Sequence, residues 1–176
     1  MNLFQWLGDE AKSLKTFRII FLSVPINLLI VMIMATLLSI MGLLPENSKP
    51  IGIPILTWFF PVFLFLAALF EELIFRLLPL LVGIAILHGY DIEEKSSYYP
   101  RLILMFSAAI IFGYAHGSWV NIFLQGFAGL VFSLVWLKCG GLQKRWVKAT
   151  LCSTLAHALY NGAIALIIIS QGGTAL

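Results

Sequence analysis

Four polar residues in apolar surroundings have the types needed to hydrolyse a peptide bond: Glu71, His116, His157 and Asn161. A carboxylate in a low-dielectric site can accept a proton from water, and a neutral imidazole can hold that water in place. The tetrahedral intermediate then needs hydrogen-bond donors aimed at its oxyanion, a task that an imidazole and a carboxamide can share. These residues therefore form a candidate catalytic set.

The spacing around Glu71 separates it from a neighbouring ion pair. Glu72 and Arg76 are four positions apart, with the acid N-terminal to the base, so their charges can neutralise each other on one helix face. Glu71 then points about 100° away around the helix and has no partner nearby in the sequence. Ionisable residues at membrane depth are costly and usually functional, facing the interior of a bundle.

Two further pairs have the same spacing. His157 and Asn161 are four residues apart, so the imidazole and the carboxamide can point at one ligand. Phe112 and His116 are also four apart, which places an aromatic ring one turn from the second imidazole.

The composition predicts a membrane protein and excludes a soluble domain. Of the 176 residues, 61% are hydrophobic and 11% are charged, whereas an ordinary globular chain is about one quarter charged. A helix needs about 20 apolar residues to cross the hydrocarbon layer. We therefore expect an all-α, polytopic transmembrane helical bundle with about five to six membrane segments, forming a single integral-membrane domain over residues 1–176.

The apolar stretches give the expected elements. A short interfacial helix is expected over 1–17, and residues 53–170 carry the motifs described above. The long second stretch contains charges together with Pro61 and Pro79, so we expect one broken or tilted element there. The expected membrane segments are 19–44, 53–88, 101–116, 119–137 and 149–170, with a charged loop at 91–100 and a basic loop at 138–148.

The net charge of +3 is explained by topology rather than by nucleic-acid binding, because no basic cluster interleaved with aromatics occurs. With five crossings, the basic N-terminus, the loop near Lys95 and the loop from Lys138 to Lys148 all fall on one side. The positive-inside rule makes that side cytoplasmic. We expect an integral protein of a bacterial inner (cell) membrane, with a cytoplasmic N-terminus.

Counting residues along the helices tests whether the polar set can meet. Glu71 lies about 27 Å from the outer end of its segment, and His157 about 13 Å from the inner end of its own. These two share a level in a hydrocarbon layer of about 30 Å. His116, about 22 Å from the inner side, is placed too near the outer surface. Its helix must begin later, tilt or slide, and the sequence leaves these alternatives open.

In this order the motifs resemble those of the CPBP family, which comprises the type II CAAX prenyl endopeptidases and the bacteriocin-processing and self-immunity (Abi) proteins. Residues 71–76, Glu-Glu-Leu-Ile-Phe-Arg, resemble EExxxR. Residues 112–116, Phe-Gly-Tyr-Ala-His, resemble FxxxH, and residues 157–161, His-Ala-Leu-Tyr-Asn, resemble HxxxN. The resemblance covers about residues 53–169.

The resemblance implies an intramembrane endopeptidase that cuts near the membrane-embedded or C-terminal tail of a protein. It implies Glu71 as the general base, His116 as a holder of the attacking water, His157 with Asn161 as the oxyanion site, and Glu72 with Arg76 as a supporting ion pair. The expected partners are a membrane-anchored protein or peptide substrate and the lipid bilayer. No cofactor is required; zinc is left open, although no HExxH pair occurs. Substrate identity and oligomeric state are also open.

Two other functions compete with proteolysis. A catalytically idle immunity or scaffold protein would keep the fold, although erosion of its motifs would then be expected. A transporter or proton relay would also place carboxylates and imidazoles at the midplane, but the chain has no internal repeat.

Several other polar, sulfur-containing or small residues are interpreted as structural. We expect His88 to lie at a surface loop, and Cys139 and Cys152 to act as small apolar residues. Asn121 and Gln125 are expected to form hydrogen bonds between helices, and Gly126 and Gly129 to permit close helix packing.

Overall fold

The computed structural model describes residues 10–44, 60–86, 98–141 and 143–170, and within these ranges the chain is helical apart from short turns, with no strand. This confirms the all-α membrane bundle. The elements in chain order are α2 (Glu10–Ile40), α3 (Phe60–Glu72), η1 (Leu73–Leu77), α4 (Leu78–Ile86), α5 (Tyr98–Ala115), α6 (Val120–Trp136), η4 (Leu137–Gly141) and α7 (Trp146–Ser170).

Within the described ranges, three helices are long and apolar enough to cross a membrane: Lys15–Ile40, Ile122–Gly141 and Trp146–Ser170. A shorter apolar helix covers Leu102–Ala115. Large exposed hydrophobic side chains occur along every helix of the bundle. Such an apolar exterior fits lipid rather than water as the surrounding solvent.

Helix α2 begins before the predicted first span. It is continuous from Glu10 to Ile40, so residues 10–17 are the first turns of the spanning helix rather than a separate interfacial one. Residues 1–9 of the predicted interfacial segment lie outside the described ranges, as do the stretches 45–59 and 87–97, which include His88.

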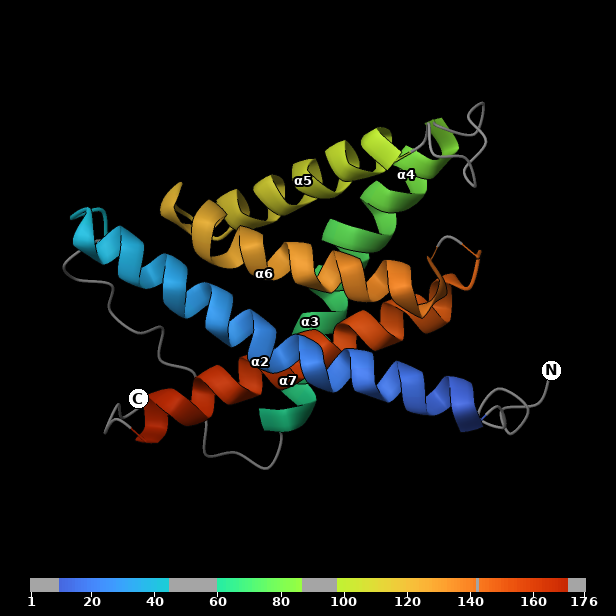
Figure 1. Cartoon of the computed structure of the whole chain (residues 1–176), viewed down its shortest axis with the longest axis horizontal. Coiled ribbons are helices and arrows are strands. Elements are labelled where there is room, and N and C mark those ends of the chain that lie inside the picture. Colours follow the sequence, from blue (N-terminus) through green and yellow to red (C-terminus); the bar gives the residue numbers. More distant parts are fainter. Residues whose placement is uncertain (1–9, 45–59, 87–97, 142, 171–176) are drawn as a thin grey trace.

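The run from α3 to α4 is the single broken and inclined element that the sequence predicts. Its middle turn, η1, is a π-helix in which the N–H of Leu78 bonds to the carbonyl of Leu73. Pro79 follows, and its ring lacks an N–H and would clash with the carbonyl of Phe75 four residues earlier. A widened turn relieves that clash. Figure 1 shows α3, η1 and α4 running obliquely across the other helices.

Helices α5 and α6 form a closely packed antiparallel hairpin. A Cβ atom at Gly113 would lie 2.5 Å from Ile122 Cα, and one at Gly126 would lie 3.0 Å from the carbonyl oxygen of Ala109. Glycine therefore lets the two backbones touch, as predicted for Gly126. The connecting turn uses Gly117, whose φ is +93°.

Two polar residues of α6 have different environments from each other. The side-chain amide of Asn121 donates to the carbonyl of His116 at 2.8 Å, so it ties the start of α6 to the turn after α5 rather than forming the predicted bond between helices. Gln125 makes no side-chain hydrogen bond to any residue in the described part of the chain, so the structure provides no support for its predicted helix-to-helix bond.

The predicted basic loop at 138–148 is wrong in its extent. The chain stays helical to Cys139, Gly140 has a non-helical backbone conformation, and a helix begins again at Trp146. Gly140, with φ +110°, makes the reversal, and its carbonyl accepts hydrogen bonds from the N–H groups of Gln143 and Arg145. Lys144 and Arg145 lie in the exposed turn between the helices, whereas Lys138 and Lys148 lie on the adjoining helices, so the irregular segment is shorter than the basic stretch.

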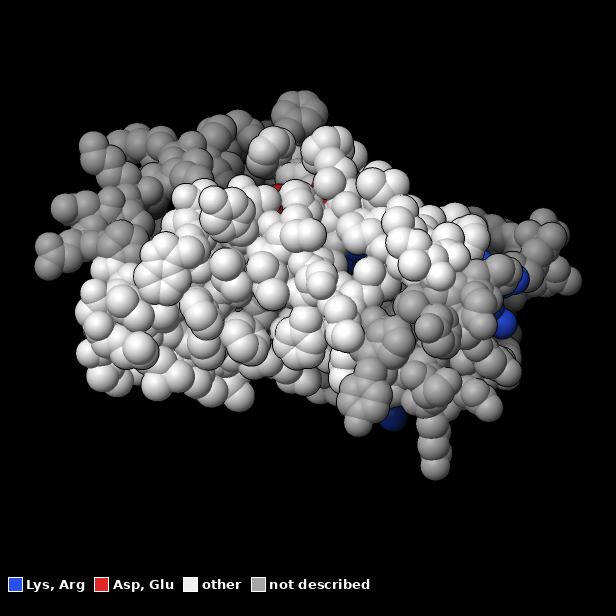
Figure 2. All heavy atoms as spheres, turned by 90° about the horizontal axis from the view of Figure 1, so that it is seen from above, with Lys and Arg blue, Asp and Glu red and all other residues white. Residues whose placement is uncertain are grey.

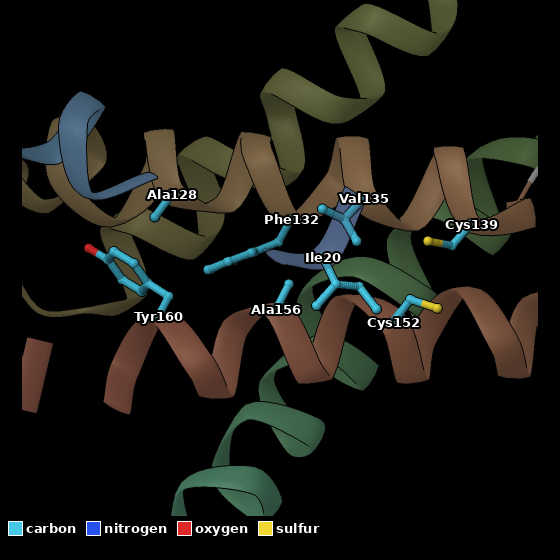
Figure 3. Close-up of a cluster of buried hydrophobic side chains, with 8 residues drawn as sticks. All are labelled: Ile20, Ala128, Phe132, Val135, Cys139, Cys152, Ala156 and Tyr160. Atoms are coloured by element: carbon cyan, nitrogen blue, oxygen red, sulfur yellow. The ribbon is translucent and has the colours of Figure 1, made fainter. Parts of the chain in front are cut away.

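The main core lies between α2, α6 and α7 (Figure 3). Phe132 of α6 and Tyr160 of α7 supply its largest side chains, and Ile20 reaches in from α2. Cys139 and Cys152 are both buried there with free thiols, as expected for small apolar residues. The buried members are Ile20, Ala128, Phe132, Val135, Cys139, Cys152, Ala156 and Tyr160.

The helix ends are grouped at the two ends of the bundle as the charge pattern predicts. In Figure 1 the start of α2, the end of α4 and the α6–α7 turn lie at one end, whereas the α5–α6 turn and the end of α7 lie at the other. Figure 2 shows Lys and Arg gathered mainly at the first end, with a broad uncharged surface beside them.

The depth problem for His116 arises from the oblique helix. Helix α5 begins at Tyr98, earlier than expected, so a later start is excluded. Counting residues assumes that all helices run parallel, but the helix carrying Glu71 crosses the others (Figure 1). Distance along the chain therefore does not measure depth for Glu71.

Candidate active site

Three of the four candidate residues converge from three parts of the fold. Glu71 is the penultimate residue of α3, His116 follows the last residue of α5, and His157 lies in the middle of α7. Nε2 of His157 lies 3.5 Å from Oε2 of Glu71, and Nε2 of His116 lies 4.0 Å from the same oxygen. Both imidazoles thus turn the same nitrogen toward one carboxylate oxygen.

Each imidazole is held by its other nitrogen. Nδ1 of His157 lies 2.9 Å from Oε1 of Glu72, and Nδ1 of His116 lies 2.8 Å from the carbonyl oxygen of Phe112. A carbonyl oxygen can only accept, so Nδ1 of His116 carries the hydrogen. In the neutral ring, Nε2 of His116 is then a hydrogen-bond acceptor facing Glu71.

The two adjacent glutamates have different surroundings. The Glu71 side chain is 29% exposed, like that of His116 at 31%, whereas the Glu72 side chain is 0% exposed. Nη1 of Arg76 lies 3.0 Å from Oε1 of Glu72, as the spacing of the two residues predicts. Glu71 therefore borders the accessible part of the cluster, and Glu72 lies inside it.

Aromatic rings enclose the buried charges. The guanidinium carbon of Arg76 lies 3.8 Å from the centroid of the Phe112 ring and 5.5 Å from that of Phe132. Phe132 stacks on His157 with centroids 4.4 Å apart and an interplanar angle of 21°. Gly129 faces Arg76 and Phe112, where a Cβ would lie 2.9 Å from Nη2 of Arg76. The predicted packing role of Gly129 thus serves the site.

Residues 53–163 match the family described as type II CAAX prenyl endopeptidase Rce1-like. The chain belongs to this family. In the comparisons with curated proteins and with solved structures, nothing matches the chain significantly. The matched residues include every candidate described above. Together with the apolar helices, membership supports an intramembrane endopeptidase of CAAX type at the level of the family.

In this Rce1-like protein, Ser153 is a site residue that the motifs do not contain. Its buried hydroxyl donates to Oε2 of Glu72 and lies 3.0 Å from the carbonyl oxygen of Phe132. The sequence holds a signal for it, because Ser153, His157 and Asn161 follow one another at four-residue intervals on one face of α7. Phe132 was also missed, because nothing in the sequence distinguishes it from the other aromatic residues of the apolar helices.

Asn161 is the candidate that the structure connects least to the Rce1-like site. It lies one turn beyond His157 on α7, half-buried, and its side chain makes no hydrogen bond to any described residue. Across the described ranges, no group of three or more His, Cys, Asp and Glu side chains is arranged to hold a metal ion.

Proposed function

We propose that this protein is an intramembrane endopeptidase in which Glu71 activates water to hydrolyse a peptide bond. The observation that supports this most strongly is the convergence of both imidazole Nε2 atoms on Oε2 of Glu71, at 3.5 Å and 4.0 Å. A partly exposed carboxylate flanked by two oriented imidazoles is suited to general-base catalysis.

His116 and Glu71 would hold the attacking water between them. Their 4.0 Å separation is too long for a direct hydrogen bond, and a bridging water spans such a gap. The water donates one hydrogen to Nε2 of His116 and gives its other proton to Glu71 as its oxygen attacks the substrate carbonyl. Glu71 then returns that proton to the leaving amine.

His157 and Asn161 would stabilise the oxyanion. Nε2 of His157 faces Glu71 and the reacting atoms, because Nδ1 donates its hydrogen to Glu72. The proton that Glu71 takes from water can pass to Nε2 of His157, 3.5 Å away, and the resulting N–H donates to the developing oxyanion before the proton returns through Glu71 to the leaving amine. Asn161, one turn farther along the same helix face, supplies a second donor from its amide.

The substrate would be a membrane-anchored protein, cut near its membrane-embedded or C-terminal tail. The exposed parts of Glu71 and His116 give a substrate access to the cluster from the apolar surface of the bundle. We place the protein in a bacterial inner membrane with the N-terminus and the α6–α7 turn in the cytoplasm, because Lys and Arg gather at that end (Figure 2).

Substitution of Glu71 by glutamine tests this function. Glu71→Gln keeps the shape of the side chain but cannot accept a proton, so turnover should fall about 100- to 10,000-fold. Two co-expressed reporters serve as substrates, one with a tagged C-terminal transmembrane tail and one ending in a prenylated CAAX sequence. Cleavage is measured by the mass of the released tail.

Lys144→Gln is the matched control, because Lys144 is an exposed charge at the α6–α7 turn. It should cleave like the wild type. If Glu71→Gln cleaves a reporter at the wild-type rate, or if the wild type cleaves neither reporter, the proposal is wrong. Retained binding of the uncut reporter without any cleavage would favour a scaffold function instead.

A further inference from the structure

The carboxylate of Glu72 contacts three side chains from two elements. Arg76 of η1 lies 3.0 Å from Oε1, and Nδ1 of His157 in α7 lies 2.9 Å from the same oxygen. The hydroxyl of Ser153, also in α7, donates to the other oxygen, Oε2. All four side chains are buried. Among the described residues, Ser153 is the only hydrogen-bond donor to Oε2.

The hydroxyl of Ser153 must choose between two acceptors. It carries one hydrogen, and both Oε2 of Glu72 and the carbonyl oxygen of Phe132 lie within hydrogen-bond distance. Hydrogen bonds to an ionised acceptor are roughly twice as strong as those between neutral groups. The hydrogen therefore goes to Glu72, and the Phe132 carbonyl limits how far the hydroxyl can move.

This bond determines the rotation of the carboxylate. Arg76 and His157 both contact Oε1, whereas Ser153 is the only donor to Oε2 among the described residues, so Ser153 anchors the half of the carboxylate that the other two do not contact. Without that donor the carboxylate can swing away from Nδ1 of His157, and the ring is then no longer restricted to one tautomer. With Oε1 directed at His157, an ionised Glu72 can only accept, so Nδ1 of His157 must carry a hydrogen and Nε2 must face Glu71.

We propose that Ser153 is a positioning residue that acts through Glu72 to fix the tautomer and orientation of His157. The effect of Ser153 on His157 is inferred from the contacts of Glu72 alone. Its effect on turnover rests on the proposed proteolytic function. Hydrogen-bonded partners of this kind commonly determine which ring nitrogen of a histidine is protonated.

The first test measures the tautomer without any substrate. Protein with ¹⁵N-labelled histidine is studied by NMR in detergent micelles, where the three histidines are assigned by substituting His88 and His116 in turn. In the wild type, His157 should give one set of signals with Nδ1 protonated. In Ser153→Ala, signals of both tautomers, or exchange broadening between them, should appear.

Ser133→Ala is the matched control. Ser133 is equally buried, and its hydroxyl donates to the carbonyl of Gly129 four residues earlier on α6. It should leave the His157 signals unchanged. Ser153→Cys places a weaker donor of similar shape at the same position and should give an intermediate result. Thermal melting of each variant shows whether it is folded. Unchanged His157 signals in folded Ser153→Ala would overturn the proposal.

The second test measures turnover of whichever reporter the wild type cleaves. Ser153→Ala should lower kcat roughly 10- to 100-fold, the loss expected for one hydrogen bond to a charged group, with KM within about twofold. Ser133→Ala should match the wild type, and Ser153→Cys should lie between. An unchanged kcat in Ser153→Ala would overturn the link to turnover. If the wild type is inactive, the proposed function fails while the NMR result still decides the role of Ser153.

Discussion

Nδ1 of His157 lies 2.9 Å from Oε1 of Glu72, a residue 85 positions earlier in the chain. The same imidazole turns Nε2 toward Glu71. Adjacent residues on a helix point about 100° apart, so one imidazole in the angle between them reaches both carboxylates. The two glutamates of one motif are thus separated by function: Glu72 orients the histidine, and Glu71 borders the substrate side.

Glu72→Gln should destabilise the protein much more than Glu71→Gln. Glu72→Gln removes the charge that balances the buried Arg76, and breaking a buried ion pair costs about 3–5 kcal/mol. Glu71→Gln changes a partly exposed group and should cost under about 1 kcal/mol. Thermal unfolding of both variants in detergent measures the contrast. Equal midpoints for the two variants would show that burial does not distinguish the glutamates.

Removal of the guanidinium should damage folding more than substrate binding. Arg76→Ala leaves Glu72 as an unpaired buried charge and removes the group that covers the Phe112 ring, with an expected loss of about 3–5 kcal/mol. Lys138→Ala, at an exposed position on η4, should change stability by less than about 0.5 kcal/mol. A wild-type melting temperature for Arg76→Ala in detergent would contradict this account of the ion pair.

Loss of either oxyanion donor should lower kcat less than loss of the general base. His157→Ala and Asn161→Ala should each raise the barrier by about 2.7–4 kcal/mol, seen mainly in kcat. Because Asn161 is half-buried and His157 is enclosed by Phe132, only His157→Ala should also lower the melting temperature. Wild-type turnover of Asn161→Ala would remove Asn161 from the mechanism.

A methyl group at Gly129 should disturb the site by crowding. Its Cβ would lie 2.9 Å from Nη2 of Arg76 and 3.0 Å from Cδ1 of Phe112, both buried, and overpacking of this kind costs about 1–3 kcal/mol. Gly162→Ala is the control, because its Cβ would meet only Cδ1 of Leu64 at an ordinary 3.8 Å. That variant should be unchanged or up to about 1 kcal/mol more stable. The reverse order of unfolding midpoints would contradict the packing described here.

The proposed orientation predicts which ends of the bundle a membrane-impermeant maleimide can reach. In a background in which Cys139 and Cys152 are replaced by alanine, Arg145→Cys should be protected in intact cells and Ser170→Cys should react. Both residues are exposed, at the start of α7 and at its end. Labelling of Arg145→Cys in intact cells together with protection of Ser170→Cys would reverse the assigned topology.

The sequence predicted the parts of the site that depend on local spacing and missed those that depend on the crossing of helices. Glu72 and Arg76 are close because they share a helix, which their spacing reveals. The contact between Glu72 and His157 joins two helices through their relative rotation, which no local pattern contains.

The error in the predicted loop has a similar origin. Charge and glycine near residues 138–148 indicated an irregular segment, whereas Trp136 and Thr150 draw the two helices together. The indole N–H of Trp136 donates to the Thr150 hydroxyl at 3.1 Å, because a buried indole needs an acceptor. That contact between α6 and α7 leaves room for only a tight turn, which Gly140 can make.

The π turn at Leu73–Leu77 divides the inclined helix into two halves whose faces are set independently. Helix α3 faces α7, and α4 faces α5. The extra residue in the widened turn rotates one half of the helix relative to the other. The regular 3.6-residue spacing of apolar residues in Phe60–Ile86 is therefore interrupted at η1. Shortening this turn by one residue would restore a regular period and rotate α4 away from α5 while α3 stayed in place. In this element, irregularity of the period is what allows both halves to fit their neighbours.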